Sequence, residues 1–309
     1  MKIVRSATAP SAALCGGALT VGNFDGVHMG HRQILAELVG HARAVGGPAI
    51  VVTFDPHPRK ILFPAEAPRR LCHLHERLAL IGACGVDAVF LLRFTRKLAA
   101  MEPEAFIAML HRRFAFRHFH AGYDFAFGRR RCGHIDALRA IGERMGFTVS
   151  AADAFEMRGA IVSSSRIRSA VEAADLDLAA ELLGRRFSIS GHVGVGDKRG
   201  RRLGFPTANL DLRDLVHPPA GIYAVRGFSG EARWGGAAYL GYRPTFAGRT
   251  LVLESHFFDV SPDLYRRRLR VEFVRRVRED RVFRDGASLV RQIERDCAAA
   301  RAILLAEEG

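Results

Sequence analysis

Short apolar runs alternate with segments of helical period through the first part of the chain. The apolar runs predict strands at residues 18–22, 49–54, 88–92, 118–121 and 148–152. The periodic segments predict helices at residues 31–45, 71–84, 103–114 and 135–145. Continuous apolar runs are typical of strands buried on both faces, and such strands joined by helices form a parallel sheet with right-handed crossovers. We therefore predict a Rossmann-like α/β fold for this part.

The pattern changes after Gly184. A helical stretch at residues 165–183 ends there, and glycine commonly caps the C-terminus of a helix. Short β-type runs separated by Gly, Pro and Asp then follow at residues 187–195, 221–227, 235–240, 251–258 and 269–277. This spacing predicts a small antiparallel barrel or sandwich, of which we favour the barrel, with a C-terminal helix at residues 287–305. We predict two domains, residues 1–184 and 185–309.

The composition is that of a globular protein with an excess of basic residues. Hydrophobic residues make up 49% and charged residues 25% of the 309 positions, which excludes a disordered or fibrous chain. The 46 Lys and Arg against 32 Asp and Glu give a net charge of +14, spread over both predicted domains. This excess fits either a solvated basic surface or a polyanionic partner, such as nucleotide phosphates or a nucleic acid.

Cysteine usage and hydropathy indicate the compartment. The five cysteines are widely spaced and form no C-x-x-C, so we expect a reducing compartment and no disulfide framework. Cys72, His73 and His75 lie close together, but no second ligand pair at zinc-like spacing accompanies them. No apolar stretch approaches the roughly 18 residues that span a bilayer, and Pro10 interrupts a start that otherwise resembles a signal peptide. We predict a cytoplasmic protein with no membrane partner.

The decapeptide G-N-F-D-G-V-H-M-G-H, residues 22–31, joins the first predicted strand to the first predicted helix. The unpaired N–H groups and the dipole of a helix N-terminus favour an anion, and His28 and His31 would add donors for phosphate oxygens. Gly22 and Gly30 would permit a tight turn and a close approach of the backbone. The plainer alternative is a turn whose histidines only cap the helix. Because a strand precedes the motif and a helix follows it, we favour the phosphate site.

Three more motifs follow in order along the first domain. They are T-F-D-P-H-P at residues 53–58, G-Y-D-F-A-F-G-R at residues 122–129 and S-S-S-R-I-R at residues 163–168. With the H-x-G-H segment, these motifs resemble those of the nucleotidylyltransferase superfamily and, within it, of the bacterial bifunctional riboflavin kinase/FMN adenylyltransferases, or FAD synthetases. The resemblance runs from about Thr20 to Arg301. It implies a nucleotidylyltransferase-type α/β domain followed by a small antiparallel β-barrel.

The resemblance implies that, in the first domain, an FMN phosphate oxygen attacks the α-phosphorus of ATP in line and pyrophosphate leaves. Such a transfer needs positioning and charge neutralisation, which we assign to His28, His31, Arg166 and Arg168, with Mg²⁺ bridging phosphate oxygens. The residues expected to bind ATP or its phosphates are Gly22, Phe24, Gly30, Ser163, Ser164, Ser165, Arg166 and Arg168. The residues expected to bind flavin are Phe54, Asp55, Pro56, His57, Asp124 and Phe127.

Each of these three motifs also has a plainer interpretation. The hydroxyls and arginines of residues 163–168 suit a polyphosphate, but a capped helix with two surface arginines is common. T-F-D-P-H-P lies where ligands bind in open α/β sheets, or it is a turn fixed by proline. The aromatic residues of 122–128 either face an isoalloxazine ring or fill the core, and Asp124 stands where the family also has asparagine.

In the second domain, a basic loop rich in glycine leads into P-T-A-N at residues 206–209, which resembles the riboflavin kinase signature. In extended chain the side chains of Thr207 and Asn209 share one face, where their oxygens would hold Mg²⁺ with ATP. The alternative is a polar turn after Pro206. The loop residues expected to bind ATP are Gly196, Lys198 and Gly204.

Glu254 lies in an otherwise apolar predicted strand, where a carboxylate requires an explanation. By resemblance it is the base that accepts a proton from the ribityl 5′-hydroxyl as this oxygen attacks the γ-phosphate of ATP, with Asn209 as a second catalytic residue. The alternative is a glutamate on the solvent face, paired with an arginine. Arg278 is expected to help close over flavin. In the second domain two residues depart from the family: Val195 stands where histidine is frequent, and Arg266 where glycine is usual, so its turn should be built differently.

The function implied is the synthesis of FMN and then FAD, with riboflavin, FMN and ATP as substrates. One alternative is that only one of the two centres is active, against which the intact motifs at both centres argue. Another is a basic nucleic-acid-binding or regulatory protein. The basic clusters at residues 129–131, 201–202 and 266–268 are short, however, and an RNP-type aromatic motif is absent. We expect no nucleic-acid partner, and the sequence predicts no particular oligomeric state.

Overall fold

The computed structural model of the chain describes residues 1–5, 12–194, 204–212, 214–245, 248–260 and 262–307. The chain divides into two compact units. Unit 1 comprises Met1–Pro68 and Leu74–Ser163, and unit 2 comprises Arg69–His73 and Ser164–Gly309. Residues 164–184, which the sequence pattern assigns to the first domain, thus group with the second unit. The domain boundary after Gly184 stays a prediction.

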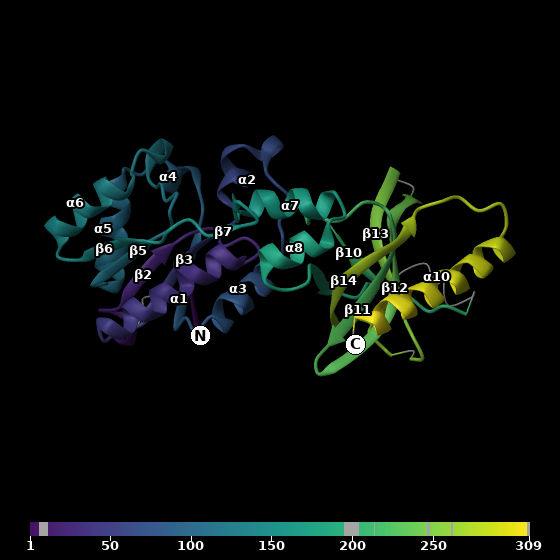
Figure 1. Cartoon of the computed structure of the whole chain (residues 1–309). Helices are drawn as coiled ribbons and strands as arrows, with labels where there is room; N and C mark the ends of the chain where they lie inside the picture. Colours follow the sequence, from purple (N-terminus) through teal and green to yellow (C-terminus); the bar gives the residue numbers. More distant parts are fainter. Residues whose placement is uncertain (6–11, 195–203, 213, 246–247, 261, 308–309) are drawn as a thin grey trace. The chain divides into compact units, whose positions relative to one another are not determined.

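Unit 1 is built on a six-stranded sheet of order β1-β4-β3-β2-β5-β6, in which all neighbouring strands are parallel (Figure 1). The strands are β1 (Lys2–Arg5), β2 (Ala18–Val21), β3 (Ala49–Asp55), β4 (Ala88–Arg93), β5 (His118–Ala121) and β6 (Thr148–Ala151). The predicted parallel α/β fold is confirmed. The apolar pattern does not predict the edge strand β1, in which only Val4 is buried.

Helices cover both faces of this sheet because successive residues of a strand point to opposite sides. One face carries α1 (Met29–Ala44) and α3 (Leu74–Ala83), and the other carries α5 (Pro103–Phe114) and α6 (Ile135–Met145). In β3, for example, Val51 packs in the first core and Val52 in the second. The short elements are η1 (Ala12–Leu14), α2 (Pro58–Leu62), η2 (Pro64–Glu66), α4 (Arg96–Ala99), η3 (Arg129–Arg131), β7 (Glu156–Met157) and β8 (Ala160–Ile161).

Two helices occur where the sequence pattern predicts one at residues 165–183. They are α7 (Ser164–Glu172) and α8 (Leu176–Leu183). Between them Ala174 adopts φ +60°, a left-handed conformation that interrupts a right-handed helix. The Asp175 carboxylate then caps α8 by accepting a backbone N–H of its first turn at 3.0 Å. The prediction of a single helix is wrong because this break and cap override the apolar periodicity.

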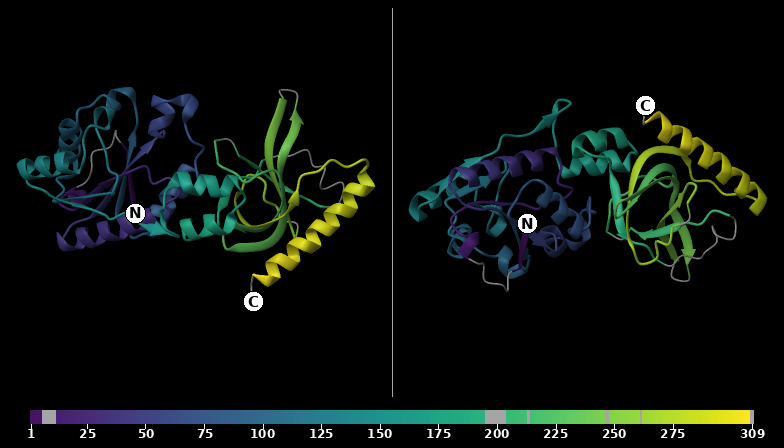
Figure 2. Two further views of the ribbon diagram at one scale, coloured as in Figure 1. Left: turned by 45° about the horizontal axis from the view of Figure 1, so that its top comes forward. Right: turned by 90° about the horizontal axis from the view of Figure 1, so that it is seen from below.

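Unit 2 contains a six-stranded antiparallel sheet of order β10-β13-β12-β11-β14-β9, which curls into a nearly closed barrel (Figure 2). Its strands are β9 (Ser188–His192), β10 (Ala208–Asp211), β11 (Gly221–Ser229), β12 (Ala232–Thr245), β13 (Gly248–Phe257) and β14 (Arg268–Glu279). At the seam the Gly194 N–H donates to the Asn209 carbonyl at 3.0 Å. The predicted barrel is confirmed, and β10, which the pattern misses, contains the last two residues of P-T-A-N, Ala208 and Asn209.

The barrel separates an apolar interior from an outer face. Leu210, Leu253 and Leu240 lie in register on three neighbouring strands and are buried inside. The C-terminal helix α10 (Gly286–Ala306) lies along the outer face, where Leu304 packs against the strands (Figure 2). Residues that alternate with the interior leucines therefore point outward, and the candidate residues of unit 2 lie on this outer side.

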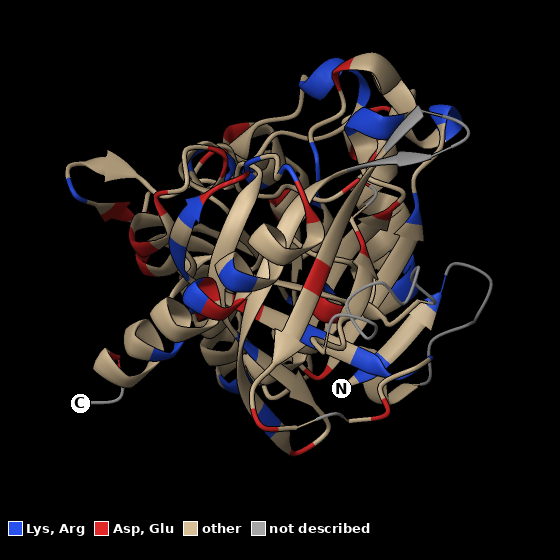
Figure 3. Ribbon diagram, turned by 90° about the vertical axis from the view of Figure 1, so that its right-hand side faces the viewer, with Lys and Arg blue, Asp and Glu red and all other residues tan. Residues whose placement is uncertain are grey.

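Basic and acidic residues are interspersed along the described elements (Figure 3). Some arginines form ion pairs, such as Arg129 with Glu102 at 2.8 Å and Arg301 with Asp259 at 2.7 Å. Pairing of this kind offsets part of the basic excess locally. Within the described residues, no helix combines the length and the hydropathy that crossing a bilayer requires.

Candidate functional site

The loop between β2 and α1 holds the H-x-G-H residues on a strained backbone. Phe24 and Val27 have φ of +50° and +42°, which is uncommon for bulky side chains and rare for a β-branched one. Both side chains are buried in the core beneath α1. A Cβ at Gly22 would lie 2.9 Å from the Phe24 ring, so the loop also requires glycine there. Burial of these two side chains therefore stabilises a strained backbone conformation. Strained backbones are common at functional sites.

His28 is the N-cap of α1, and its Nδ1 accepts a hydrogen bond from the His31 N–H at 3.3 Å. Because Nδ1 is the acceptor, a neutral His28 ring carries its proton on Nε2. The two imidazole rings stack with centroids 3.6 Å apart. A Cβ at Gly30 would lie 3.4 Å from both the His28 ring and the Phe155 Cβ, so this packing leaves little room for a side chain. Capping uses one nitrogen of His28 and is therefore compatible with a phosphate site.

The His31 ring is held in its neutral form. Removal from water, together with the nearby His28 and Arg77, lowers the pKa of His31 well below its ordinary value of 6.5. Its Nδ1 is buried and has no hydrogen-bond partner among the described residues. Buried polar atoms are nearly always hydrogen-bonded in native proteins. A ligand oxygen would supply the partner that this nitrogen needs.

Arg77 of α3 is a positioning residue that the sequence pattern does not reveal. Its Nη1 donates to the Asn23 carbonyl at 3.0 Å, and its Nη2 donates to the Phe54 carbonyl at 2.8 Å. The Thr53 hydroxyl donates to the same Asn23 carbonyl at 3.2 Å. Arg77 is buried and therefore ties the H-x-G-H loop to the end of β3. The signal in the sequence was a charged residue within an amphipathic helix.

The T-F-D-P-H-P residues lie near that loop because β2 and β3 are parallel neighbours whose carboxyl ends meet at one edge of the sheet. Phe54 and Asp55 end β3, and the peptide bond between Asp55 and Pro56 is cis. His57 caps α2 through Nδ1, which accepts the Arg59 N–H at 3.2 Å. The segment is thus a proline-containing turn at the ligand-binding edge, and its contact with flavin stays a prediction.

The G-Y-D-F-A-F-G-R segment divides between surface and core. Asp124 is exposed, whereas Phe127 is buried in the core that includes α5. The Phe127 ring stacks on Phe125 with centroids 5.1 Å apart and an interplanar angle of 18°. This packing favours the core-filling alternative for Phe127. The flavin contacts of Asp124 and Phe127 stay predictions.

The S-S-S-R-I-R motif falls on the division between the units, after its first serine, and its other residues begin α7. In unit 2, Arg168 Nε donates to the Arg69 carbonyl at 2.6 Å. This bond occupies one donor of the guanidinium. The assignment of residues 163–168 to phosphate binding stays a prediction.

In unit 2, Asn209 of β10 lies directly opposite Glu254 of β13, and Tyr239 of β12 lies opposite Glu254 on the other side. Residues in register on antiparallel strands point to the same face, with Cβ atoms about 5 Å apart. The three side chains therefore form one polar row across the outer face of the barrel. Glu254 is 6% exposed, which excludes the alternative of a solvated glutamate.

The same row continues through Ile222 of β11 to Arg278 of β14. Arg278 Nε and Nη2 each donate to the Asp296 carboxylate of α10 at 2.8 Å, and Nη1 donates to the Glu279 carbonyl at 2.7 Å. Gln292 also donates to buried Asp296, at 2.7 Å. Arg278 thus ties α10 to the barrel, a role the sequence pattern does not predict, and its contact with flavin stays a prediction.

P-T-A-N leads into β10, so Asn209 lies in the strand and Thr207 directly precedes it. That the two side chains share one face stays a prediction. Asn209 Nδ2 donates to the Thr207 carbonyl at 3.4 Å. Hydroxyl and amide oxygens are hard donors that suit Mg²⁺. Gly204 adopts φ +87°, while Gly196 and Lys198 lie outside the described residues.

Arg266 shows how one departure from the family pattern is accommodated. Its φ is +62°, in the left-handed region that glycine adopts most readily. The Arg266 N–H donates to the Val193 carbonyl at 3.1 Å. The arginine therefore occupies a glycine-type turn, contrary to the expectation of a differently built one. Val195, the other departure, lies outside the described residues.

Comparison with known proteins assigns both parts of the chain. Residues 11–166 match the family model described as FAD synthetase, and residues 183–304 match the model described as riboflavin kinase. The bifunctional riboflavin kinase/FMN adenylyltransferase of Pseudomonas fluorescens is 43% identical over 290 residues, which cover 93% of each chain. The chain belongs to this bifunctional family.

Other relatives extend the family match. The enzyme of the same description from Escherichia coli K12 is 40% identical over 304 residues, covering 97% of each chain, and that of Bacillus subtilis is 32% identical over 284 residues. A crystal structure described as a macrolide-efflux protein from Streptococcus pneumoniae superimposes with a TM-score of 0.84 at 26% identity. It covers 96% of this chain and 97% of its own. The fold is therefore shared over nearly the whole chain.

Membership of the family establishes the function of the chain and confirms the resemblance seen in the motifs. The chain is a riboflavin kinase and an FMN adenylyltransferase, which convert riboflavin to FMN and FMN to FAD. Riboflavin, FMN and ATP are the substrates of such enzymes. Phosphoryl and adenylyl transfer from ATP imply a divalent metal ion.

Proposed function

We propose that each unit carries out one of the two steps, with riboflavin phosphorylated on the barrel and FMN adenylylated at the H-x-G-H loop. The observation that carries this division is the buried Glu254, in register with Asn209 and Tyr239. A carboxylate is seldom buried among the strands of a barrel, so the position of Glu254 requires an explanation. A role as the base that takes a proton from a substrate hydroxyl explains it.

On the barrel, Glu254 accepts the proton of the ribityl 5′-hydroxyl as this oxygen attacks the γ-phosphorus of ATP, and the bond to the ADP oxygen breaks. Asn209, opposite Glu254, orients the reacting groups. Thr207 and Asn209 hold Mg²⁺, whose charge offsets that of the phosphates. Gly196, Lys198 and Gly204 bind ATP, and Arg278 approaches the flavin.

In unit 1, a phosphate oxygen of FMN attacks the α-phosphorus of ATP and pyrophosphate leaves. The protein supplies positioning and stabilisation of charge, and no covalent intermediate is needed. His28 donates Nε2–H to a phosphate oxygen, and His31 donates as a neutral ring because its pKa is lowered. The remaining proposed ATP contacts are Gly22, Phe24, Gly30 and residues 163–168, and the proposed flavin contacts are Phe54, Asp55, Pro56, His57, Asp124 and Phe127.

A product assay on the purified full-length chain tests both steps. With riboflavin, ATP and Mg²⁺, we expect FMN to form first and FAD to follow, each quantified by chromatography. Replacing Mg²⁺ by Mn²⁺, Ca²⁺ or a chelator tests the choice of metal. If the protein forms FMN but no FAD, even when FMN is supplied as a substrate, then only the kinase centre is active.

Separate expression of residues 1–184 and 185–309 tests the division into domains. The first fragment should convert FMN to FAD, and the second should convert riboflavin to FMN. Because α7 and α8 group with unit 2, a second pair cut after Ser163 is the matched control. If only the fragments cut after Ser163 fold, the domain boundary lies at the start of α7. If no fragment folds, the units are not independent.

The cytoplasmic location and the absence of nucleic-acid and membrane partners stay predictions. A nucleic-acid-binding protein would lose affinity steeply with added salt and would turn over no flavin. Salt titration with a labelled oligonucleotide therefore separates that alternative from the flavin enzyme.

A further inference from the structure

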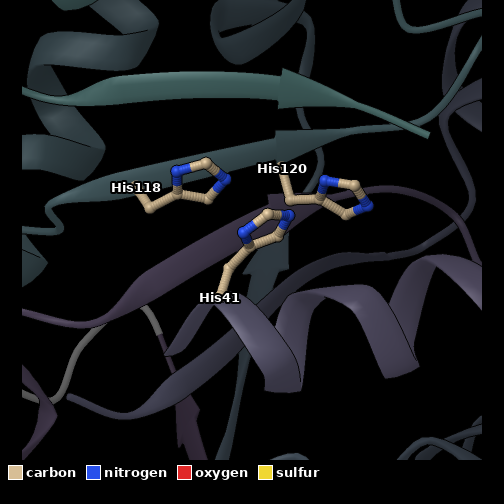
Figure 4. A group of neighbouring side chains, drawn as sticks. All are labelled: His41, His118 and His120. Carbon is tan, nitrogen blue, oxygen red and sulfur yellow. The ribbon is translucent and has the colours of Figure 1, made fainter. Parts of the chain in front are cut away.

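Three histidines of unit 1 lie together outside the H-x-G-H loop. His41 is in the last turn of α1, and His118 and His120 project from β5 toward it (Figure 4). Among the described residues, they form the one group of three or more His, Cys, Asp or Glu whose ligand atoms all lie within 4.8 Å of one another. The rings of His41 and His118 stack with centroids 4.1 Å apart. Neither proposed reaction uses these histidines.

One nitrogen of each ring converges on the same oxygen, the hydroxyl of Ser150 in β6. Ser150 Oγ lies 3.2 Å from His41 Nε2, and 2.8 Å from both His118 Nε2 and His120 Nδ1. A hydroxyl has one proton to donate and two lone pairs. The Ser150 hydroxyl can therefore donate a hydrogen bond to only one ring nitrogen that presents a lone pair.

The opposite nitrogen of the His118 ring already acts as a donor, and that of His120 lies beside a carboxylate. The Thr148 hydroxyl donates its proton to a backbone carbonyl, so its oxygen accepts from His118 Nδ1–H at 2.7 Å. His120 Nε2 lies 2.9 Å from the Glu37 carboxylate, which is an acceptor only. A neutral His118 ring therefore directs a lone pair at Ser150, and the single hydroxyl proton can satisfy no second lone pair from His41 or His120.

Burial favours the neutral form of both rings. Removal from water, with His41 and His120 nearby, lowers the pKa of His118 to about 4. Removal from water also lowers the pKa of His120, against the opposing influence of Glu37.

We propose that His41, His118 and His120 bind a divalent transition-metal ion, represented by Zn²⁺, at the point where their nitrogens converge. Neutral imidazole is a preferred ligand of Zn²⁺, whereas Mg²⁺ prefers oxygen. Histidines that bind metals usually donate their other N–H to a carboxylate or similar acceptor, as His118 Nδ1 does to the Thr148 hydroxyl.

The geometry requires a small contraction. The ligand nitrogens must close from at most 4.8 Å to about 3.4 Å, the separation set by tetrahedral Zn–N bonds of about 2.1 Å. Rotation of the Ser150 side chain clears the central position. The ion joins the last turn of α1 to β5 and so stabilises the helix that carries His28 and His31 at its other end. Its role is structural and separate from the metal that the reactions with ATP need.

Calorimetric titration of the chelator-treated full-length protein with Zn²⁺ should show one ion bound per chain, with or without excess Mg²⁺. His41→Gln and His120→Gln should each lower the affinity by at least about 100-fold. The surface variant His134→Gln is the matched control and should change nothing. Ser150→Ala should retain binding within a few fold, because the hydroxyl is not a required ligand. Loss of binding in Ser150→Ala would overturn the three-histidine site.

Because variants of buried rings can fail to fold, Co²⁺ binding to the unaltered protein is a second measurement. Imidazole ligands give the visible bands of tetrahedral Co²⁺ without an intense ultraviolet band from thiolate. A thiolate band, or loss of binding in Cys72→Ser, would assign the ion to a cysteine and overturn the proposal. Absence of stoichiometric Zn²⁺ binding, or unchanged binding in a folded His120→Gln, would do the same.

Discussion

The two candidate sites are held by different kinds of backbone. In unit 1 the site residues lie on a loop at the ends of parallel strands, held by buried side chains and by the hydrogen bonds of Arg77. In unit 2, Asn209, Glu254 and Tyr239 lie on the strands themselves, and their alignment follows from register. The first arrangement depends on many local contacts, and the second on the pairing of whole strands.

This difference determines which structural changes disrupt each site. A one-residue slip between strands would turn Glu254 into the barrel interior and bring Leu253 out, so the barrel site fails as a whole. The loop site can lose one contact at a time without movement of the sheet. Side-chain substitutions in each unit should therefore separate the two activities.

Glu254→Gln should have the largest effect. Glutamine keeps the shape and polarity of the side chain but does not accept the proton, so kinase turnover should fall by about 10²–10⁴-fold. FMN adenylylation should be unchanged and reports that the protein is folded. The measurement is FMN formation at saturating riboflavin and ATP.

Glu272→Gln is the matched control for Glu254→Gln, because Glu272 is a partly buried carboxylate on β14 of the same barrel. Its kinase turnover should stay within a few fold of the parent. If Glu254→Gln behaves like this control, Glu254 is a structural residue and the base lies elsewhere.

The double substitution of His28→Ala and His31→Ala should have the opposite effect on the two activities. FAD formation should fall by about 10²–10³-fold, the range seen when a donor to a developing charge is removed. FMN formation should stay within a few fold. Loss of the His28 cap also costs about 1 kcal/mol of stability, so assays are run well below the measured melting temperature. Equal loss of both activities would contradict separate centres.

Local patterns in the sequence predict those features that local forces determine. The five predicted strands of unit 1 begin at the predicted residues. Four of them, β2 to β5, are largely buried, as continuous apolar runs predict, whereas β6 is a partly exposed edge strand. The H-x-G-H loop lies between strand and helix as expected, since its glycines and N-cap are encoded within ten residues. The break before Asp175 is also local, but apolar periodicity hides it.

Features that depend on distant partners could not be predicted. Arg77 is 54 residues from Asn23 and 23 from Phe54, so neither hydrogen bond has a sequence signature. The pairing of Asn209 with Glu254 depends on strand register, which a single sequence does not specify. Isolated histidines in a helix and a strand likewise gave no sign that they meet.

The two units should also differ in their response to pH. Burial raises the pKa of Tyr223 in the barrel to about 12, although Arg276 opposes the shift. Between pH 10 and 12 the unfolded chain releases this proton and the folded barrel keeps it. The free energy of unfolding should therefore fall by on the order of 2–3 kcal/mol as the pH rises. In unit 1 the pKa of His31 is lowered, so stability should instead fall as the pH drops below 6.5.

Two reporters distinguish these responses. Trp234, the single tryptophan, lies in β12 and reports on the barrel by fluorescence, and hydrogen exchange of peptides from α1 reports on unit 1. Tyr223→Phe should remove the alkaline loss, and His31→Gln should reduce the acid loss. An unchanged pH profile in either variant would contradict the assigned group.

Arg266→Gly should have the smallest effect, and in the opposite direction. The left-handed conformation at Arg266 costs a residue with a Cβ about 1–2 kcal/mol, and glycine avoids this cost but loses more entropy on folding. The net result should be a gain in stability of about 0.5–1 kcal/mol, measured by urea unfolding through Trp234 fluorescence. Arg267→Gly is the control, because Arg267 does not have a positive φ and should lose stability on substitution. A loss in both variants would mean that the Arg266 side chain contributes more than its backbone strain costs.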